Sequence, residues 1–100
     1  MRKFKGTETE KVSVPVEQFP WDIGGKYITR QDLYVWDDAG ENKKVWEDGD
    51  PGIADEFGNA MLNSGTMVIV KDVEKVDETY WVKTDLGWLC GKNPKITYVS

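Results

Sequence analysis

The chain has 100 residues, with 18 acidic and 13 basic side chains and a formal net charge of -5. One domain is the expected organisation at this length, and the acidic balance argues against non-specific binding to nucleic acid or to an anionic membrane. The sequence contains no histidine and a single cysteine, Cys90. It therefore excludes a Ser-His-Asp triad, a Cys-His pair and a zinc site built on imidazoles or several thiolates.

The N-terminal part of the chain is predicted to be an arm followed by an edge strand. Residues 1–11 are polar and slightly basic, and we expect a flexible arm. Residues 12–100 are expected to form one small domain. At its start, residues 12–16 alternate valine with other side chains, which is typical of a half-buried strand, and Pro15 places that strand at a sheet edge because proline donates no backbone hydrogen bond.

Further segments have the composition and spacing of short β-strands. Residues 26–36 are rich in β-branched and aromatic side chains and predict one strand or a bent pair. Residues 65–71 form a nearly continuous apolar strand, and residues 79–84 and 87–90 follow, two residues apart, as in a tight hairpin. Three residues near the C-terminus are expected to close the sheet: Ile96, Tyr98 and Val99. Short strands at short intervals predict an all-β fold, either a small barrel or a sandwich.

A long acidic segment, residues 37–64, separates the second predicted strand from the third. It contains eight carboxylates and two lysines, a net charge of -6, so the rest of the chain sums to +1. A connection this long is often functional. We expect a loop that holds a short helix, with Asp50 as its cap, Pro51 in its first turn, and apolar residues at helical spacing: Ile53, Phe57 and Met61.

Four stretches of the chain resemble the bacterial Src-homology-3-like domain family over residues 27–92. They are G-T-M-V-I-V at 65–70, Y-W-V-K-T at 80–84, D-L-G-W-L at 85–89 and Y-I-T-R-Q-D-L-Y-V-W at 27–36. The acidic segment is longer than the family's usual connection, and the first 26 residues have no counterpart. The resemblance implies a strongly bent barrel of five or six strands that carries no chemistry. It also implies binding of an extended peptide or a cell-wall stem through aromatics beside the loops.

Acidic and aromatic side chains are the candidate binding residues. Acidic runs usually just solvate a surface, but these carboxylates could also present a negative field to a basic partner. An exposed indole is a common binding anchor; we expect Trp81 to be exposed, because the Gly87-Trp88-Leu89 signature is typical of a packed strand start. The full candidate set is Trp36, Asp37, Asp38, Glu41, Trp46, Glu47, Asp48, Asp50 and Trp81.

Three other types of site receive little support from the residues. Carboxylates suit calcium, but the acidic runs lack the regular D-x-D-x-D-G ladder with a distant glutamate. Two carboxylates on a loop supply poor rigidity for glycoside hydrolysis. Cys90 follows an apolar pair and is expected to be a small buried hydrophobe. We therefore expect no enzyme activity, no metal and no cofactor.

These observations favour a non-catalytic module that binds a protein or peptide of basic character and does not bind nucleic acid directly. Two alternatives stay open. The chain could be a small acidic phage-type inhibitor that blocks the nucleic-acid site of a host enzyme, or a wall-targeting module whose ligand is peptidoglycan. No export signal and no apolar run of about 18 residues is evident, so we expect a soluble, cytoplasmic protein without a membrane contact.

Overall fold

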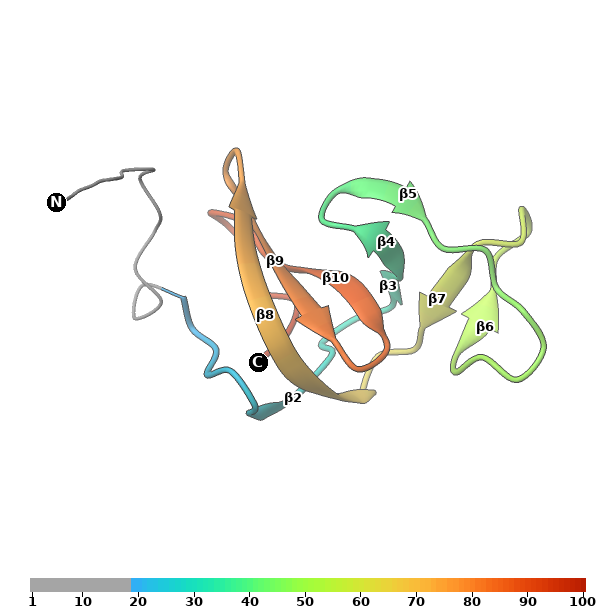
Figure 1. Ribbon diagram of the computed structural model, residues 1–100, viewed down its shortest axis with the longest axis horizontal. Coiled ribbons are helices and arrows are strands. Elements are labelled where there is room, and N and C mark those ends of the chain that lie inside the picture. The colour runs from blue at the N-terminus through green and yellow to red at the C-terminus, as the bar shows by residue number, and fades with distance from the viewer. Residues whose placement is uncertain (1–18) are drawn as a thin grey trace, which may run out of the picture.

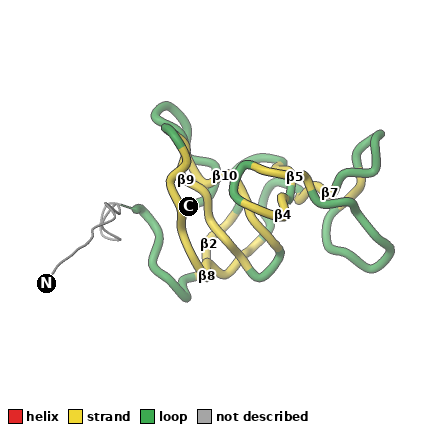
Figure 2. The backbone as a smooth tube through the Cα atoms, turned by 45° about the horizontal axis from the view of Figure 1, so that its top comes forward, coloured by secondary structure: helices red, strands yellow, loops and turns green. Residues whose placement is uncertain are grey.

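The computed structural model describes residues 19–100, which form nine β-strands joined by turns and no helix (Figures 1 and 2). This part of the chain accordingly has no helix long and apolar enough to cross a membrane. The arm expected at residues 1–11 and the edge strand expected at residues 12–16 lie outside the described residues. The strands are β2 (Lys26–Ile28), β3 (Leu33–Tyr34), β4 (Trp36–Asp38), β5 (Glu41–Lys43), β6 (Ile53–Ala54), β7 (Ala60–Leu62), β8 (Met67–Val76), β9 (Thr79–Thr84) and β10 (Gly87–Lys92).

The strands form two antiparallel sheets, which confirms the all-β prediction. The larger sheet has six strands in the order β2-β8-β9-β10-β4-β5, and the smaller has three in the order β3-β7-β6. Both orders are open, so the strands do not close into one barrel. The chain leaves the larger sheet at β2, enters the smaller at β3 and returns at β4, which places the two sheets next to each other.

Strands β8, β9 and β10 form a meander that the sequence predicted well. β9 spans the residues expected, and the two-residue connection between Thr84 and Gly87 makes the expected tight hairpin. β8 is longer than expected because it continues to Val76, where it pairs with Thr79 across a second two-residue turn. Its pairing register shifts between Val70 and Asp72, at a bulge of the kind that bends a strand.

The C-terminal segment connects β10 with β2. Tyr98 N and Val99 N both donate to the carbonyl of Gly91 in β10, and Ser100 and Ile28 exchange two backbone hydrogen bonds. Trp21 holds this segment in place, because its indole Nε1 donates a buried hydrogen bond of 2.8 Å to the Val99 carbonyl. The expectation that the last residues complete the sheet is thus met by backbone pairing on both sides.

The acidic segment 37–64 contains no helix, and the expected helical loop is wrong. It folds instead into the β4–β5 hairpin and the β6–β7 hairpin. Ile53 and Met61 pair across the second hairpin, and Phe57 lies at its turn. The equal spacing of these three residues, which predicted one face of a helix, arises because the two strands pair symmetrically about the turn. The carboxylate of Asp50 accepts from Glu47 N, backwards along the chain, and so closes a turn rather than capping a helix.

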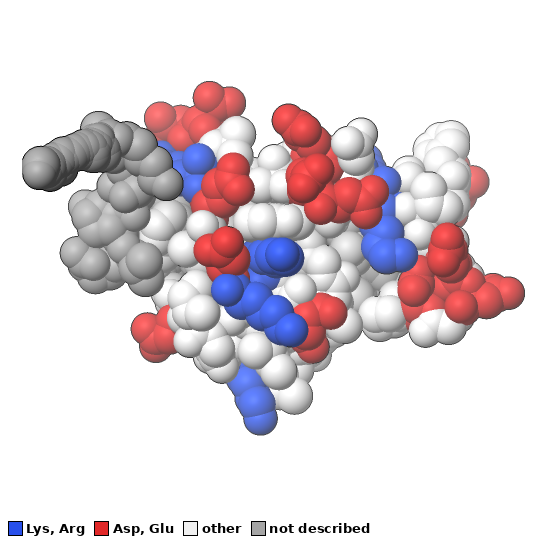
Figure 3. All heavy atoms as spheres, in the orientation of Figure 1, with Lys and Arg blue, Asp and Glu red and all other residues white. Residues whose placement is uncertain are grey.

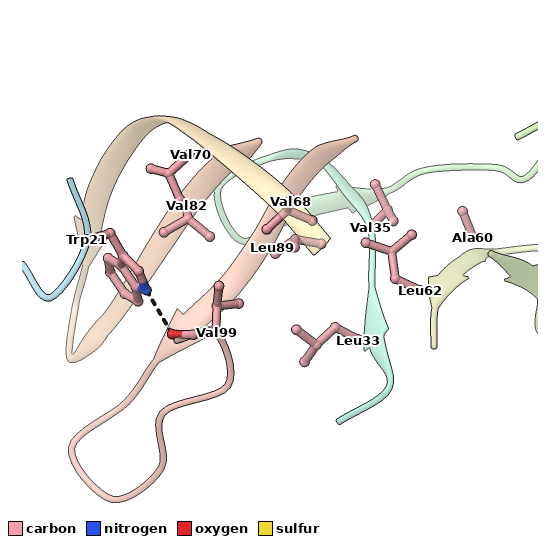
Figure 4. Close-up of a cluster of buried hydrophobic side chains, with 10 residues drawn as sticks. All are labelled: Trp21, Leu33, Val35, Ala60, Leu62, Val68, Val70, Val82, Leu89 and Val99. Atoms are coloured by element: carbon pink, nitrogen blue, oxygen red, sulfur yellow. Dashed lines mark hydrogen bonds between the residues drawn. The ribbon is translucent and has the colours of Figure 1, made fainter. Parts of the chain in front are cut away.

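The hydrophobic core lies between the meander, the C-terminal segment and the inner face of the smaller sheet (Figure 4). Residues of both sheets contribute to it: the smaller sheet joins the core through β3 and β7, whereas both residues of β6 are exposed. Its buried members are Trp21, Leu33, Val35, Ala60, Leu62, Val68, Val70, Val82, Leu89 and Val99.

Candidate binding surface

Three tryptophans lie together on the face of the six-stranded sheet that points away from the core. Trp88 in β10 is paired directly with Trp36 in β4, and Cys90 is paired with Trp81 in β9. Directly paired residues, and residues two apart in a strand, project from the same face of a sheet. The rings of Trp36 and Trp81 meet edge to face, with centroids 5.5 Å apart.

The expectation that Trp81 is exposed is wrong. Trp81 is 9% exposed, whereas Trp36 and Trp88 are half-buried. The β4–β5 hairpin covers Trp81: Gly40, at its tip, has φ of 77°, and a Cβ built on it would lie 3.4 Å from the indole. A glycine is favoured here both because of its left-handed backbone and because the ring lies directly beneath it. The aromatic surface offered to solvent is therefore that of Trp36 and Trp88.

The β4–β5 hairpin carries the first group of candidate carboxylates. Asp37, Asp38 and Glu41 are all exposed, and Asp38 and Glu41 are paired across the hairpin. Like charges directly opposite one another repel, which lowers the stability of the hairpin. On the same hairpin, the Lys43 ammonium lies 3.9 Å from the ring centroid of Tyr34 and 5.6 Å from that of Trp36, so it is held over aromatic rings.

The turn after β5 carries the second group. Glu47 and Asp48 are exposed, but Asp50 is engaged within the fold. Its carboxylate lies 2.8 Å from the Lys44 ammonium and accepts a 2.8 Å hydrogen bond from Glu47 N. These two contacts lower the pKa of Asp50 and the first of them raises the pKa of Lys44. Asp50 therefore shapes the turn, and the charge it presents outward is offset by Lys44.

Trp46 supports the same turn from inside. It is half-buried and packs against the core cluster, so it offers less surface than an anchor would. Its indole Nε1 is buried and forms no hydrogen bond within the part of the chain that the structure describes. Burial without a partner is a cost to the folded state.

Asp55 organises the β6–β7 turn. It was not among the candidate residues identified from the sequence. Its carboxylate accepts hydrogen bonds from Phe57 N and Asn59 N at 2.8 Å and from the Tyr34 hydroxyl at 2.9 Å. Desolvation works to raise the pKa of Asp55, but the hydrogen bonds outweigh it and lower the pKa to about 2. An aspartate followed three residues later by Gly58 is a turn signature that could have identified this hairpin from sequence.

The surface charges are gathered into groups. Figure 3 shows acidic side chains over the β4–β5 hairpin and again at the end of the molecule formed by β6 and β7, with basic side chains between them. Within residues 19–100, no three histidine, cysteine or acidic side chains are grouped so that they could hold a metal ion. Burial raises the pKa of the Cys90 thiol, which keeps it protonated at neutral pH.

Comparison of the chain with protein-family models, with curated proteins and with solved structures finds no match in any of the three.

Proposed function

We propose that this protein is a non-catalytic binding module that engages a basic protein or peptide through its acidic segment, residues 37–64. One observation carries the proposal. Among residues 19–100, Asp50 is the only carboxylate of this segment in an ion pair, and Asp55 is occupied by hydrogen bonds. The other six are exposed and have no basic partner in that part of the chain: Asp37, Asp38, Glu41, Glu47, Asp48 and Glu56.

A concentration of unpaired carboxylates favours a basic partner for a physical reason. Like charges held close together on a folded surface repel one another, and a partner that supplies lysine or arginine removes that repulsion. The same field steers a basic partner toward the surface and discourages acidic competitors. Trp36 and Trp88, half-buried beside the β4–β5 hairpin, supply the aromatic part of the proposed surface.

We also propose a partly open Src-homology-3-like barrel, built from both sheets, as the finer description of residues 27–92. The proposal is supported by the β8–β9–β10 meander and by the C-terminal segment, which bonds to both Gly91 and Ile28. It is further supported by Gly87, the glycine of the Gly-Trp-hydrophobic signature, which has a φ of 123° and where a Cβ would lie 2.5 Å from the Val35 side chain.

The test uses short labelled peptides that alternate lysine with serine or glutamate with serine. We expect the lysine peptide to bind and the glutamate peptide not to bind. Raising the salt from about 50 to about 500 mM should weaken binding about tenfold or more, because the Debye length shrinks from about 14 Å to about 4 Å. A salt-independent affinity, or equal binding of both peptides, would contradict the proposal.

A matched pair of charge variants locates the effect. The triple variant Glu47→Gln, Asp48→Asn and Glu56→Gln should weaken lysine-peptide binding. The control Asp72→Asn, Glu74→Gln and Glu78→Gln removes the same charge from exposed positions in and after β8 and should leave most of the affinity. Equal losses would mean that only net charge matters and that the acidic segment is not a site.

The two alternatives from the sequence make different predictions in the same assays. An inhibitor that occupies a basic nucleic-acid site should be displaced from its host target by short duplex DNA, because both compete for the same cationic surface. A wall-targeting module should co-sediment with purified cell walls at high salt, where a charge-driven complex dissociates.

A further inference from the structure

The outer face of the smaller sheet is apolar where a sheet of this type is ordinarily polar. Antiparallel sheets that pack on a core through one face usually present polar side chains on the other. Here the inner face packs into the core through Leu33, Ala60 and Leu62. The outer face instead carries Ile53, which is 46% exposed, and Val45, which is 64% exposed.

The strand register places these side chains on one surface. Ile53 is paired with Met61 across β6 and β7, and Tyr34 is paired with Met61 across β3 and β7. Val45 is paired with Asn59, which immediately precedes β7 and lies two residues before Met61, so both project to the same side. The 2.9 Å hydrogen bond from Tyr34 to Asp55, the residue two after Ile53, crosses this same face. We call the surface formed by Val45, Ile53, Met61 and Tyr34 the Ile53 face.

Phe57 lies at the β6–β7 turn, next to this surface in the chain. It is 81% exposed, more than any other large hydrophobic residue in the described part of the chain. Its backbone is fixed, because Phe57 N donates to the Asp55 carboxylate and Gly58 N donates to the Asp55 carbonyl. The phenyl ring is thus carried by an ordered turn, so less conformational entropy of the turn is lost when a partner binds.

The exposed charges at the two turns that flank the Ile53 face are all negative. Glu47, Asp48 and Glu56 are exposed at the two turns that flank it, and none of them has an ion-pair partner among residues 19–100. The nearby lysines are already engaged: Lys44 with Asp50, and Lys43 over the Tyr34 ring. An apolar centre with an acidic rim is complementary to a segment that has apolar side chains between basic ones.

We propose that the Ile53 face, with Phe57, docks a segment of a partner protein in which large apolar side chains alternate with lysine or arginine. This inference rests on the proposed function and assigns its binding energy to a specific surface. The apolar side chains of the partner cover Val45, Ile53 and Phe57, and its basic side chains reach Glu47, Asp48 and Glu56. Burial of the apolar centre supplies affinity, and the rim supplies specificity for charge.

The test compares two labelled peptides of equal length and charge, one alternating lysine with leucine and one alternating lysine with serine. We expect the leucine peptide to bind at least about tenfold more tightly. The double variant Phe57→Ser and Val45→Thr should reduce the leucine peptide to the affinity of the serine peptide. It should leave binding of the serine peptide unchanged, because that peptide uses the carboxylates alone.

The control variant removes apolar surface elsewhere. Met67 is 59% exposed and Ile96 is 48% exposed, and neither lies in the smaller sheet, so Met67→Ser with Ile96→Thr should keep the full preference for leucine. Circular dichroism establishes that both variants fold. Equal binding of the two peptides, or equal loss of the preference in both double variants, overturns the assignment to the Ile53 face.

The outcomes separate this inference from the proposed function. If both peptides bind equally and in a salt-dependent way, the acidic module stands and the Ile53 face is not its site. If neither peptide binds, the proposed function fails together with this inference. If the protein sediments as a dimer that Phe57→Ser dissociates, a second copy covers the face and the partner segment proposed here is wrong.

Discussion

Two buried indole N–H groups of this protein differ in whether they have a hydrogen-bond partner. Comparing them measures the contribution of one buried hydrogen bond to the free energy of unfolding. The Trp21 Nε1 group donates to the Val99 carbonyl at 2.8 Å, and the side chain is 1% exposed. The Trp46 Nε1 group is buried without a partner among residues 19–100. Replacing either tryptophan with phenylalanine removes the same atoms. At position 21 the substitution removes an indole N–H that has a hydrogen-bond partner, and at position 46 it removes one that has none in the described part of the chain.

Trp21→Phe should be strongly destabilising. It removes a buried hydrogen bond and leaves the Val99 carbonyl without this donor, which costs about 1–3 kcal/mol. It also removes part of a ring that packs against Gly91, where a Cβ would lie only 2.5 Å from the indole. The lost contacts add about 1–2 kcal/mol. The expected total is about 2–5 kcal/mol, a large fraction of the stability of a domain this small.

Trp46→Phe should be neutral or stabilising. The half-buried ring again loses contacts worth about 1 kcal/mol, but the substitution also removes an unsatisfied buried donor, which returns about 1–3 kcal/mol. We expect the free energy of unfolding to lie between that of the wild type and about 2 kcal/mol above it.

Urea unfolding followed by far-UV circular dichroism measures both variants without relying on tryptophan emission. Trp21→Phe should have the lower midpoint, with a melting temperature about 10 °C or more below that of Trp46→Phe. Equal destabilisation of the two variants would refute the reasoning, because the unpaired indole N–H of Trp46 would then not lower the stability of the folded state.

Two further pairs of variants test the aromatic face and the glycine signature. Trp81→Ala should lower the free energy of unfolding by about 3–5 kcal/mol, whereas Trp88→Ala, which removes a half-buried ring, should cost less; chemical denaturation that ranks them in the opposite order contradicts the burial described here. Gly87→Ala should destabilise more than Gly65→Ala in the same measurement. Both glycines have positive φ, but a Cβ on Gly87 would lie 2.5 Å from Val35 and one on Gly65 meets open space, so equal losses would mean that backbone strain alone matters.

The sequence predicted the strands whose pattern is local. Residues 79–84 and the hairpin that follows them were located correctly, because alternating apolar residues and a two-residue connection are both visible within a short window. Residues 26–36 were correctly taken as extended and bent, but the structure divides them among three strands and two sheets. That division depends on pairing with distant residues, such as that of Trp36 with Trp88, which no local pattern records.

The helix predicted in the acidic segment was wrong because a helix and a hairpin can have the same spacing of apolar residues. Apolar residues at positions 53, 57 and 61 fit one face of a helix, and they equally fit a hairpin whose turn is centred on the middle residue. Turn chemistry decides between them: Asp55 and Gly58 form a turn that a helix could not use. The burial of Trp81 was missed for another reason, because it is set by where the tip of the β4–β5 hairpin comes to rest, and that is a tertiary contact.

The turn at Asp55 should also make the display of Phe57 sensitive to acid. Its folded-state pKa of about 2 lies below the ordinary value of 3.8, so the unfolded chain binds the proton more readily. The stabilisation is therefore fully present above about pH 4 and is lost as the pH falls through about 2. Protonation weakens the hydrogen bonds from Phe57 N and Asn59 N together, so the β6–β7 turn should loosen in this range.

A titration of side-chain carboxyl carbons by nuclear magnetic resonance tests this directly. Asp55 should titrate near 2, well below the ordinary aspartate value of 3.8. Tyr34→Phe removes one of the hydrogen-bond donors to the Asp55 carboxylate and should raise the pKa of Asp55. If Asp55 titrates at its ordinary value, or if Tyr34→Phe has no effect on it, the carboxylate does not hold the turn, and the fixed position assigned to Phe57 on the Ile53 face loses its physical basis.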